Sequence, residues 1–295
     1  MNMNKIAESE LIIDKRGAIY HIGARPEEMA DTIFIVGDPD RVAIVSKHFD
    51  SIEFKTQHRE FIMHTGYLGK KRVSVLSTGI GPDNIDIALN EIDALANIDF
   101  ESRRVKPSLK QVNIIRLGTS GALQADVAID SFVAGTHGLG FDNVMHFYKT
   151  NINSEEETII KDFKVHTGLT SGNVIPYIFS GNRELLSVFK NGYHQGITAA
   201  CPGFYGPQGR VLRLPLEYEG LVDKLTSFRS GEHHIANFEM ESSAIYGLGS
   251  LLGHRCLSLN VIVANRVIKQ FSKDSTKAVE SLIKFSLDCY SSSTL

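Results

Sequence analysis

The sequence predicts an α/β fold with a mixed or mostly parallel central sheet. Short runs rich in Ile and Val alternate with longer segments that have one apolar face, and several short runs are apolar almost throughout. Such runs are typical of strands in a sheet covered on both faces, and their alternation with helices is typical of α/β proteins. The 295 residues hold no repeat and no Pro/Gly-rich linker. We therefore expect one domain over residues 1–295, a size within reach of a single α/β core.

Six buried strands are predicted, in chain order, at residues 32–36, 73–77, 112–117, 131–134, 197–200 and 257–264. Helices are predicted at 84–97, 239–252 and 276–289, because their apolar residues recur on one helical face. Residues 1–17 form a polar tail, and 97–111 form a polar insert. The glycine-rich stretch 203–236 is predicted to be a long loop, and long loops often carry function.

Composition excludes several classes of protein. The 31 basic and 34 acidic residues give a formal net charge of −3, which argues against nucleic-acid binding. The longest apolar runs are far shorter than the roughly 18–20 residues of a membrane span, and the first residues lack a secretory-signal pattern. Three widely spaced cysteines, without a CxxC pair, suit a reducing compartment. We expect a cytoplasmic enzyme that uses no metal, nucleic acid or membrane.

Two strand ends carry groups suited to an anion. Gly37 follows the first strand and permits close backbone approach, and Arg41 comes four residues later. An ordinary strand–turn–helix with Asp38 as the helix cap is the alternative for this segment. Arg116 lies inside an apolar strand, where it is costly unless it meets an anion or a carboxylate. The glycines and hydroxyls of 118–121 follow it as flexible backbone, so a phosphate cradle or a buried arginine–aspartate pair is expected.

A third segment, Glu239-Met240-Glu241, opens the predicted helix 239–252. Carboxylates are favourable near a helix N-terminus, so helix capping is one interpretation. A carboxylate also accepts two hydrogen bonds from a vicinal diol, and Met240 offers a soft apolar surface. This combination fits a ribose.

Taken together, the motifs GDPDR, HREF, STGIG, IRLGTSG, FYGPQGR, FEMESS and ANR resemble, in order, those of the nucleoside phosphorylase family. The resemblance is strongest to its uridine phosphorylase branch and runs from about His21 to about Arg266. It implies a single-domain three-layer sandwich whose mixed, partly barrel-like central sheet is flanked by helices. It also implies a pentosyltransferase that converts uridine and phosphate to uracil and ribose 1-phosphate, with phosphate as co-substrate and no organic cofactor.

The resemblance assigns roles to individual residues. Phosphate binding falls to Gly37, Arg41, Arg59, Arg116 and Thr119. Ribose binding falls to His21, Thr119, Glu239, Met240 and Glu241. Uracil binding falls to Phe204, Gln208, Arg210 and Arg266, and the catalytic set is Arg210, Gln208 and Arg116. In the family, the residues corresponding to His21 and Arg59 serve the neighbouring subunit's site. We therefore expect at least a homodimer and, in the family's manner, a hexamer built from dimers.

Specificity is predicted from the residues after the last core strand. Hexameric purine phosphorylases place an aspartate there, whereas this chain reads Ala264-Asn265-Arg266, which favours a pyrimidine. Nucleosidases of the same fold lack the phosphate arginines, so the arginines favour phosphorolysis over hydrolysis. A broader nucleoside phosphorylase and a non-catalytic nucleoside-binding module remain alternatives.

Three departures from the family pattern affect finer expectations. Asn84 stands where the family has a serine that, with the glutamate of HREF (Glu60), binds a monovalent cation such as K⁺; this counts against that cation site. The insert 97–111 bears on the assembly, and Gly206-Pro207 bears on the geometry of the base loop.

The polar stretch 267–277 is interpreted as a lid that excludes water. His137, His146, His233 and His234 are expected to be core or surface histidines rather than ligands.

Overall fold

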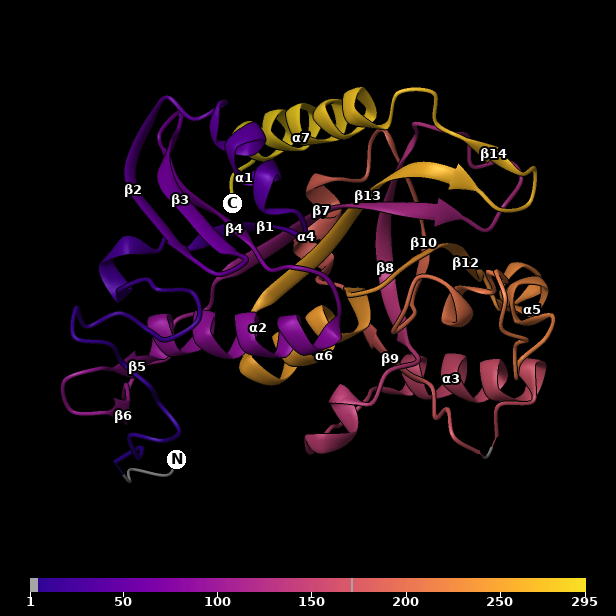
Figure 1. Cartoon of the computed structure of the whole chain (residues 1–295), viewed down its shortest axis with the longest axis horizontal. Coiled ribbons are helices and arrows are strands. Elements are labelled where there is room, and N and C mark those ends of the chain that lie inside the picture. The colour runs from indigo at the N-terminus through magenta and orange to yellow at the C-terminus, as the bar shows by residue number, and fades with distance from the viewer. Residues whose placement is uncertain (1–4, 171) are drawn as a thin grey trace.

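The computed structural model describes residues 5–170 and 172–295. A large mixed sheet lies between two layers of helices (Figure 1). Helices α2 (Pro82–Asn97) and α6 (Ser242–Leu252) cover one face, and α1 (Pro39–Ser46), α4 (Arg183–Val188) and α7 (Ser275–Ser291) cover the other. Strand β1 (Thr32–Val36) shows why both faces are covered. Ile33 and Ile35 enter the core beneath α2, whereas Phe34 and Val36 enter the core beneath α7, because alternate side chains of a strand point to opposite faces.

The sheet of the described residues has 12 strands, and its main path runs β11-β12-β10-β8-β13-β7-β1-β4-β3-β2. The strands besides β1 are β2 (Ser51–His58), β3 (Phe61–Leu68), β4 (Lys71–Ser77), β7 (Asn113–Ala122), β8 (Phe132–Gly140), β9 (Tyr177–Ser180), β10 (Tyr193–Ala200), β11 (Arg229–Ser230), β12 (His233–Glu239), β13 (Arg255–Asn265) and β14 (Gln270–Phe271). Strands β4, β1, β7 and β13 are parallel neighbours, so their carboxyl ends meet at one edge.

One end of the sheet curls into a ring. Strand β12 pairs with β10 in parallel and also with β7 in antiparallel fashion, where Phe238 lies opposite Gly121. Strands β7, β13, β8, β10 and β12 therefore form a closed circuit of neighbours. Helices α3 (Ser154–Thr167) and α5 (Leu221–Ser227) pack outside this ring on a separate apolar core. The predicted mixed sheet flanked by helices is thus confirmed.

Several predicted boundaries were wrong. The strand predicted at 112–117 continues to Ala122, because β13 pairs with it along its whole length. Residues 118–121 are therefore ordered strand rather than flexible backbone, since ladder hydrogen bonds outweigh the low strand propensity of glycine. The helix predicted from 239 begins at Ser242, and Glu239 is the last residue of β12.

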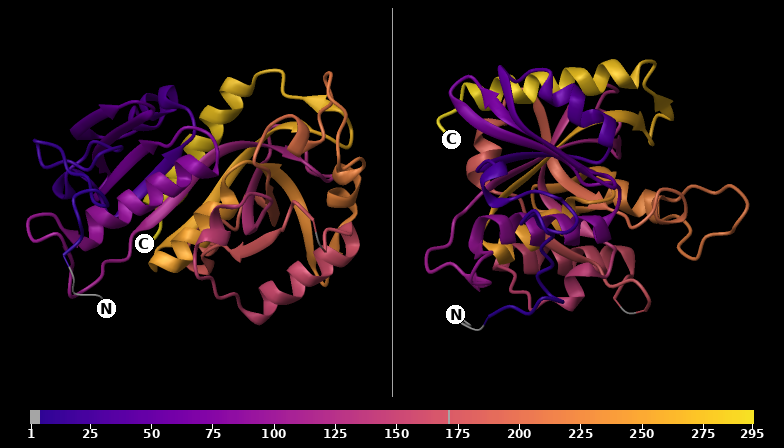
Figure 2. Two further views of the ribbon diagram at one scale, coloured as in Figure 1. Left: turned by 60° about the horizontal axis from the view of Figure 1, so that its bottom comes forward. Right: turned by 60° about the vertical axis from the view of Figure 1, so that its left-hand side comes forward.

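The predicted long loop 203–236 also contains ordered elements: a short 3-10 helix η3 (Gly206–Gln208), α5, β11 and the start of β12. Between η3 and α5, a loop extends away from the rest of the molecule (Figure 2). Its side chains Val211, Leu212 and Leu214 are exposed. The stretch 267–277 was predicted to be flexible, but it contains β14, which pairs with β13. The antiparallel pair β2–β3 was not predicted, because β2 is largely exposed and has no apolar run.

The insert 97–111 carries a small hairpin of β5 (Ile98–Asp99) and β6 (Arg104–Val105), and the N-terminal segment packs against it. The backbone N–H of Ile6 donates to the carbonyl of Arg103 at 2.8 Å, and Arg103 Nε donates back to the carbonyl of Ile6. Residues 1–4 of the predicted tail lie outside the described residues. None of the helices in the described part of the chain combines the length and apolar content that a membrane crossing requires.

Candidate active site

A cleft of about 730 Å³ opens at the carboxyl ends of the central strands. Ligands of open α/β sheets bind at this edge, because the loops leaving adjacent parallel strands diverge there. The segment after β1 contributes Gly37 and Arg41, the second half of β7 contributes Thr119, and the end of β12 contributes Phe238 and Glu239. The loop 203–210 closes the opposite end of the cleft. The predicted site residues that line it are Gly37, Arg41, Arg116, Thr119, Phe204, Gln208, Arg210, Glu239, Met240 and Glu241.

Arg41 comes from the first turn of α1, directly beyond β1. Asp38 caps this helix by accepting from the backbone N–H of Asp40 at 3.0 Å, so the capping interpretation of the segment is confirmed. The cap leaves Arg41 directed into the cleft, where its Nη1 donates to the carbonyl of Leu117 at 3.2 Å. Burial lowers the pKa of Arg41, and the neighbouring charge of Arg116 lowers it further. Two guanidinium groups close enough to repel each other make this end of the cleft attractive to an anion.

Arg116 is buried in β7 and is held from two sides. Its Nη2 donates to Glu241 Oε2 at 2.5 Å and lies 3.4 Å from Glu239 Oε2. Its Nη1 donates to Asn260 Oδ1 at 2.7 Å. Burial opposes the charge on Arg116, but the two carboxylates outweigh burial and raise its pKa. The carboxylate partners are glutamates, so the predicted arginine–aspartate pair is wrong in the identity of the acid.

Glu239 and Glu241 have different partners although one residue separates them. Glu239 accepts from the backbone N–H groups of Ser242 at 2.9 Å and Glu241 at 3.1 Å, and so caps α6. Glu241 bridges Arg116 and the backbone N–H of Gly81, 2.8 Å from its Oε1. Burial raises the pKa of Glu239, Arg116 opposes that rise, and Glu241 adds to it. Both carboxylates face the same cleft, with Met240 between them in sequence.

The far end of the cleft is built around Arg210. Its guanidinium lies 3.7 Å from the centre of the Phe204 ring, and its Nη1 donates to Gln208 Oε1 at 2.5 Å and to the Phe204 carbonyl at 2.6 Å. Gln208 Nε2 in turn donates to the carbonyl of Glu239 at 3.3 Å. Burial lowers the pKa of Arg210, and the nearby charge of Arg266 adds to this effect. This end offers an aromatic face, an amide and a cation to a planar polar ring.

Three predicted residues do not line the cleft. Arg266 donates from Nη1 to the carbonyl of Gln208 at 3.1 Å and so holds the loop 203–210. His21 is bound to Glu91 of α2, with Nδ1 and Oε1 2.6 Å apart. Arg59 sits in the β2–β3 turn with φ of 54° and faces the ring of Tyr20 at 5.9 Å. The next residue, Glu60, does line the cleft, so Arg59 lies at its margin.

The sequence reasoning did not find several apolar residues of the cleft. Phe238 from β12, Val263 from β13 and Phe271 from β14 also line it. Apolar residues in strands have the same pattern whether they face a core or a cleft, so the sequence held no signal that distinguishes them. Glu60 and Asn84, considered from the sequence only as cation ligands, also line the cleft.

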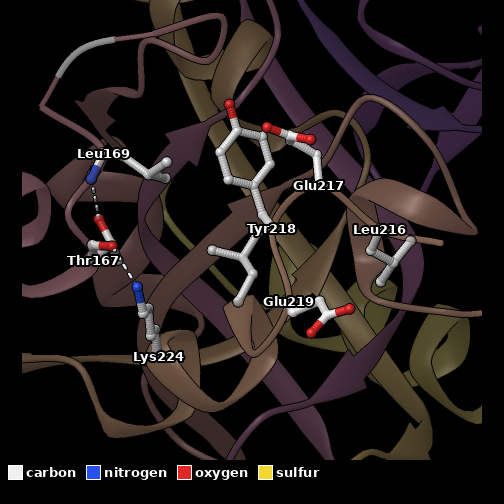
Figure 3. Close-up of a pocket in the computed structure, with 8 residues that line it drawn as sticks. Thr167, Leu169, Leu216, Glu217, Tyr218, Glu219 and Lys224 are labelled. Atoms are coloured by element: carbon white, nitrogen blue, oxygen red, sulfur yellow. Dashed lines mark hydrogen bonds between the residues drawn. The ribbon is translucent and has the colours of Figure 1, made fainter.

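A separate cavity of about 360 Å³ lies where the 216–221 segment meets the end of α3 (Figure 3). Lys224 donates from Nζ to the carbonyl of Thr167 at 2.7 Å, and the backbone N–H of Leu169 donates to the hydroxyl of Thr167 at 3.3 Å. Glu217 and Glu219 also line it. The predicted site residues lie elsewhere, so this cavity is not the candidate active site.

The family model described as the phosphorylase superfamily matches residues 31–289. The chain belongs to this superfamily. Its match to the uridine phosphorylase of Thermococcus kodakarensis is 29% identical over 278 residues, covering 93% of this chain and 87% of the relative. The purine nucleoside phosphorylase DeoD-type of Oceanobacillus iheyensis is 28% identical over 249 residues, with 84% and 87% covered. The predicted nucleoside phosphorylase family is thus confirmed.

The fold is also that of solved superfamily members. A Trypanosoma brucei nucleoside phosphorylase, described as showing uridine phosphorylase activity, matches with a TM-score of 0.88 and 30% identity. The match covers 96% of this chain and 100% of that one. The superfamily fold therefore extends over nearly the whole chain, including the segments that carry the cleft.

Proposed function

We propose that this protein is a uridine phosphorylase, a pentosyltransferase that converts uridine and phosphate to uracil and ribose 1-phosphate. One observation carries the proposal: a single cleft holds two arginines at one end, a Met–Glu pair in the middle, and the Phe204–Gln208–Arg210 group at the other. This order matches the order of phosphate, ribose and base in the reacting complex. The uridine phosphorylases among the relatives support the same reaction.

In the proposed reaction, a phosphate oxygen attacks C1′ of the ribose as the bond from C1′ to N1 of uracil breaks. The bonding pair leaves on the base, and the ribose passes through a state resembling an oxocarbenium ion. Arg41 and Arg116, together with Thr119 and the backbone at Gly37, hold the phosphate beneath C1′. Glu241 accepts hydrogen bonds from the ribose hydroxyls, while Met240 packs against the sugar. Phosphate is the co-substrate, and the scheme needs no organic cofactor.

The base end stabilises the departing uracil. As the C1′–N1 bond breaks, negative charge spreads onto the carbonyl oxygens of uracil, and Arg210 places positive charge there. Gln208 presents an amide that matches a carbonyl and the adjacent N3–H. Arg210 and Gln208 also bind each other, with Arg210 Nη1 donating to Gln208 Oε1. Uracil therefore replaces an internal contact with two of its own, which orients the ring against Phe204 and beside Arg266.

His21 and Arg59 are proposed to complete the cleft of a neighbouring subunit in a homo-oligomer of two or more chains. Neither lines the cleft of its own chain, and Arg59 lies at its margin. On this proposal His21 binds the ribose 5′-hydroxyl and Arg59 adds a third cation to the phosphate. The chain acts as one domain, with residues 1–17 as a tail and 97–111 as an insert. We place the enzyme in the cytoplasm, in pyrimidine salvage.

A monovalent cation at Glu60 and Asn84 stays a secondary element of the proposal. Both side chains reach the cleft near Gly79, where the Asn84 Nδ2 atom and the Glu60 Cγ atom lie within 2.3 and 3.2 Å of the position a Cβ on residue 79 would take. These nearest atoms are an amide nitrogen and a methylene carbon rather than oxygen ligands, so the packing at Gly79 gives the cation site no direct support. Activity in K⁺ against activity in a large organic cation tests the site.

A broader nucleoside phosphorylase is the second candidate, favoured by the purine phosphorylase relative at 28% identity. The test is uracil release from uridine by the purified protein, with and without phosphate, beside inosine, deoxyuridine and thymidine. Phosphate-dependent turnover with uridine preferred supports the proposal. Preference for inosine supports the second candidate, whereas equal turnover without phosphate, or binding without turnover, contradicts phosphorolysis.

A further inference from the structure

The Arg116 side chain lies along its own strand and extends toward Gly118. Arg116 and Gly118 share one face of β7, and Ser258 and Asn260 occupy the paired positions on β13. A Cβ atom on residue 118 would lie 1.6 Å from Arg116 Nη1 and 2.7 Å from Asn260 Oδ1. The guanidinium therefore occupies the space that a side chain at 118 would fill. Only glycine at this position leaves room for the contact between Arg116 and Asn260.

Asn260 is fully buried, and its amide has a fixed orientation. An arginine has no acceptor, so the amide oxygen must face Arg116 Nη1, which lies 2.7 Å away. The amide nitrogen then donates to the Ser258 hydroxyl at 3.2 Å. Asn260 itself does not line the cleft. Its contact is made with the arginine and not with the space where substrates bind.

We propose that Asn260 is a positioning residue that fixes the Arg116 guanidinium in the orientation that binds phosphate, with Gly118 supplying the space for it. The inference rests on the proposed function, because it assigns phosphate to Arg116. Arg116 Nη2 donates to the carboxylate of Glu241, and Arg116 Nη1 donates to Asn260 on β13. With both fixed, the remaining N–H groups point in set directions. Without Asn260, Glu241 and Glu239 would draw the guanidinium toward themselves and away from the anion.

The experiment measures the binding of inorganic phosphate by calorimetry and the KM for phosphate and for uridine. Hydrogen bonds to charged groups set the scale, so Asn260→Ala is expected to weaken phosphate about tenfold to a hundredfold. The KM for uridine should change much less. Gly118→Ala perturbs the same arginine without removing a hydrogen-bonding group, and should weaken phosphate in the same selective way. Gly118→Ala also keeps the inference testable if Asn260→Ala fails to fold.

Asn97→Ala is the matched control. Asn97 is also buried, and it binds Asp93 and the 110 backbone far from the cleft. It should lower stability while leaving both KM values unchanged. Because Asn260 acts through Arg116, adding Asn260→Ala to Arg116→Ala should cause no further loss of phosphate affinity.

Phosphate affinity within twofold of wild type in both Asn260→Ala and Gly118→Ala would overturn the inference, as would equal rises in the two KM values. The proposed function fails separately if the wild-type protein binds phosphate but does not release uracil; the phosphate-binding comparison then still decides the role of Asn260. If the wild-type protein does not bind phosphate, both the function and the inference are wrong.

Discussion

Replacing Arg210 with alanine tests the base end of the cleft. The side chain holds three contacts: 2.5 Å to Gln208 Oε1, 2.6 Å to the Phe204 carbonyl, and 3.7 Å to the Phe204 ring centre. On the proposed function, Arg210→Ala removes the positive charge that faces the departing uracil. It also releases Phe204 and Gln208, which are proposed to contact the uracil ring. Loss of one preorganised donor to developing charge costs about 10²–10³ in rate. That range corresponds to about 2.7–4 kcal/mol of transition-state stabilisation.

The assay is steady-state uracil release from uridine at saturating phosphate, with the KM for phosphate measured in parallel. We expect kcat/KM for uridine to fall by about 10²–10³ while the KM for phosphate stays near wild type, because Arg41 and Arg116 lie at the other end of the cleft. Arg213→Ala is the matched control, since Arg213 is an exposed arginine of the same loop that does not line the cleft. It should retain wild-type kinetics.

A fall of less than about tenfold in Arg210→Ala would refute the assignment of Arg210 to the departing base. So would a selective rise in the KM for phosphate, because it would place the anion at the wrong end of the cleft. An equal loss in Arg213→Ala would show that the loop as a whole, rather than the guanidinium at 210, controls the rate.

Three other predictions concern the assembly, a buried ion pair and acid stability. If Arg59 serves the neighbouring cleft, Arg59→Ala and Arg116→Ala should each be inactive on their own. When the two variants are co-refolded, about a quarter of wild-type activity should return, because half of the random dimers are mixed and each mixed dimer holds one intact cleft. No recovery on mixing would show that Arg59 acts in its own subunit or not at all. Glu241→Gln removes one of the two carboxylates that face the buried Arg116. Urea denaturation should show a loss of about 3–5 kcal/mol in the free energy of unfolding, and the KM for uridine should rise. An unchanged unfolding midpoint would contradict the ion pair. Burial lowers the pKa of His137 from 6.5 to about 4, and the charge of His233 adds to this. As the pH falls, His137 is therefore protonated in the unfolded state before it is protonated in the folded state. About 3 kcal/mol of stability that is present above pH 6.5 is lost as the pH falls toward 4. His137→Asn should flatten that part of a stability–pH curve, and a curve that keeps its wild-type slope would show that burial of His137 is not the cause.

The chemistry at the strand ends could be inferred from residue types. An arginine in an apolar strand must meet a negative charge, so Arg116 was identified without any tertiary information. The capping of α1 by Asp38 also followed from local sequence, because the Asp–Pro pair specifies a helix start. The apolar lining residues Phe238 and Phe271 could not be found, since strand periodicity does not tell a cleft from a core.

Boundaries failed where pairing overrides local preference. Residues 118–121 contain two glycines and were expected to be flexible, yet β13 pairs with them, with a register shift at Val263, and β12 pairs with Gly121 and Ala122. Glu239 looked like the start of a helix because carboxylates favour that position. It does cap α6, but from the last position of a strand, which its own side chain could not reveal.

By itself, the sequence determined the α/β class, the order of the central strands and helices along the chain, and the residue types able to bind an oxyanion, a sugar and a base. These features depend on local periodicity and on the cost of burying charge, and both can be judged from residues that are close together in the sequence. Tertiary structure alone decided the partner of each charge. Arg116 is 125 positions from Glu241 and 144 from Asn260. Such separations are closed only when β7, β12 and β13 pair, and strand pairing depends on the whole sheet rather than on any one segment.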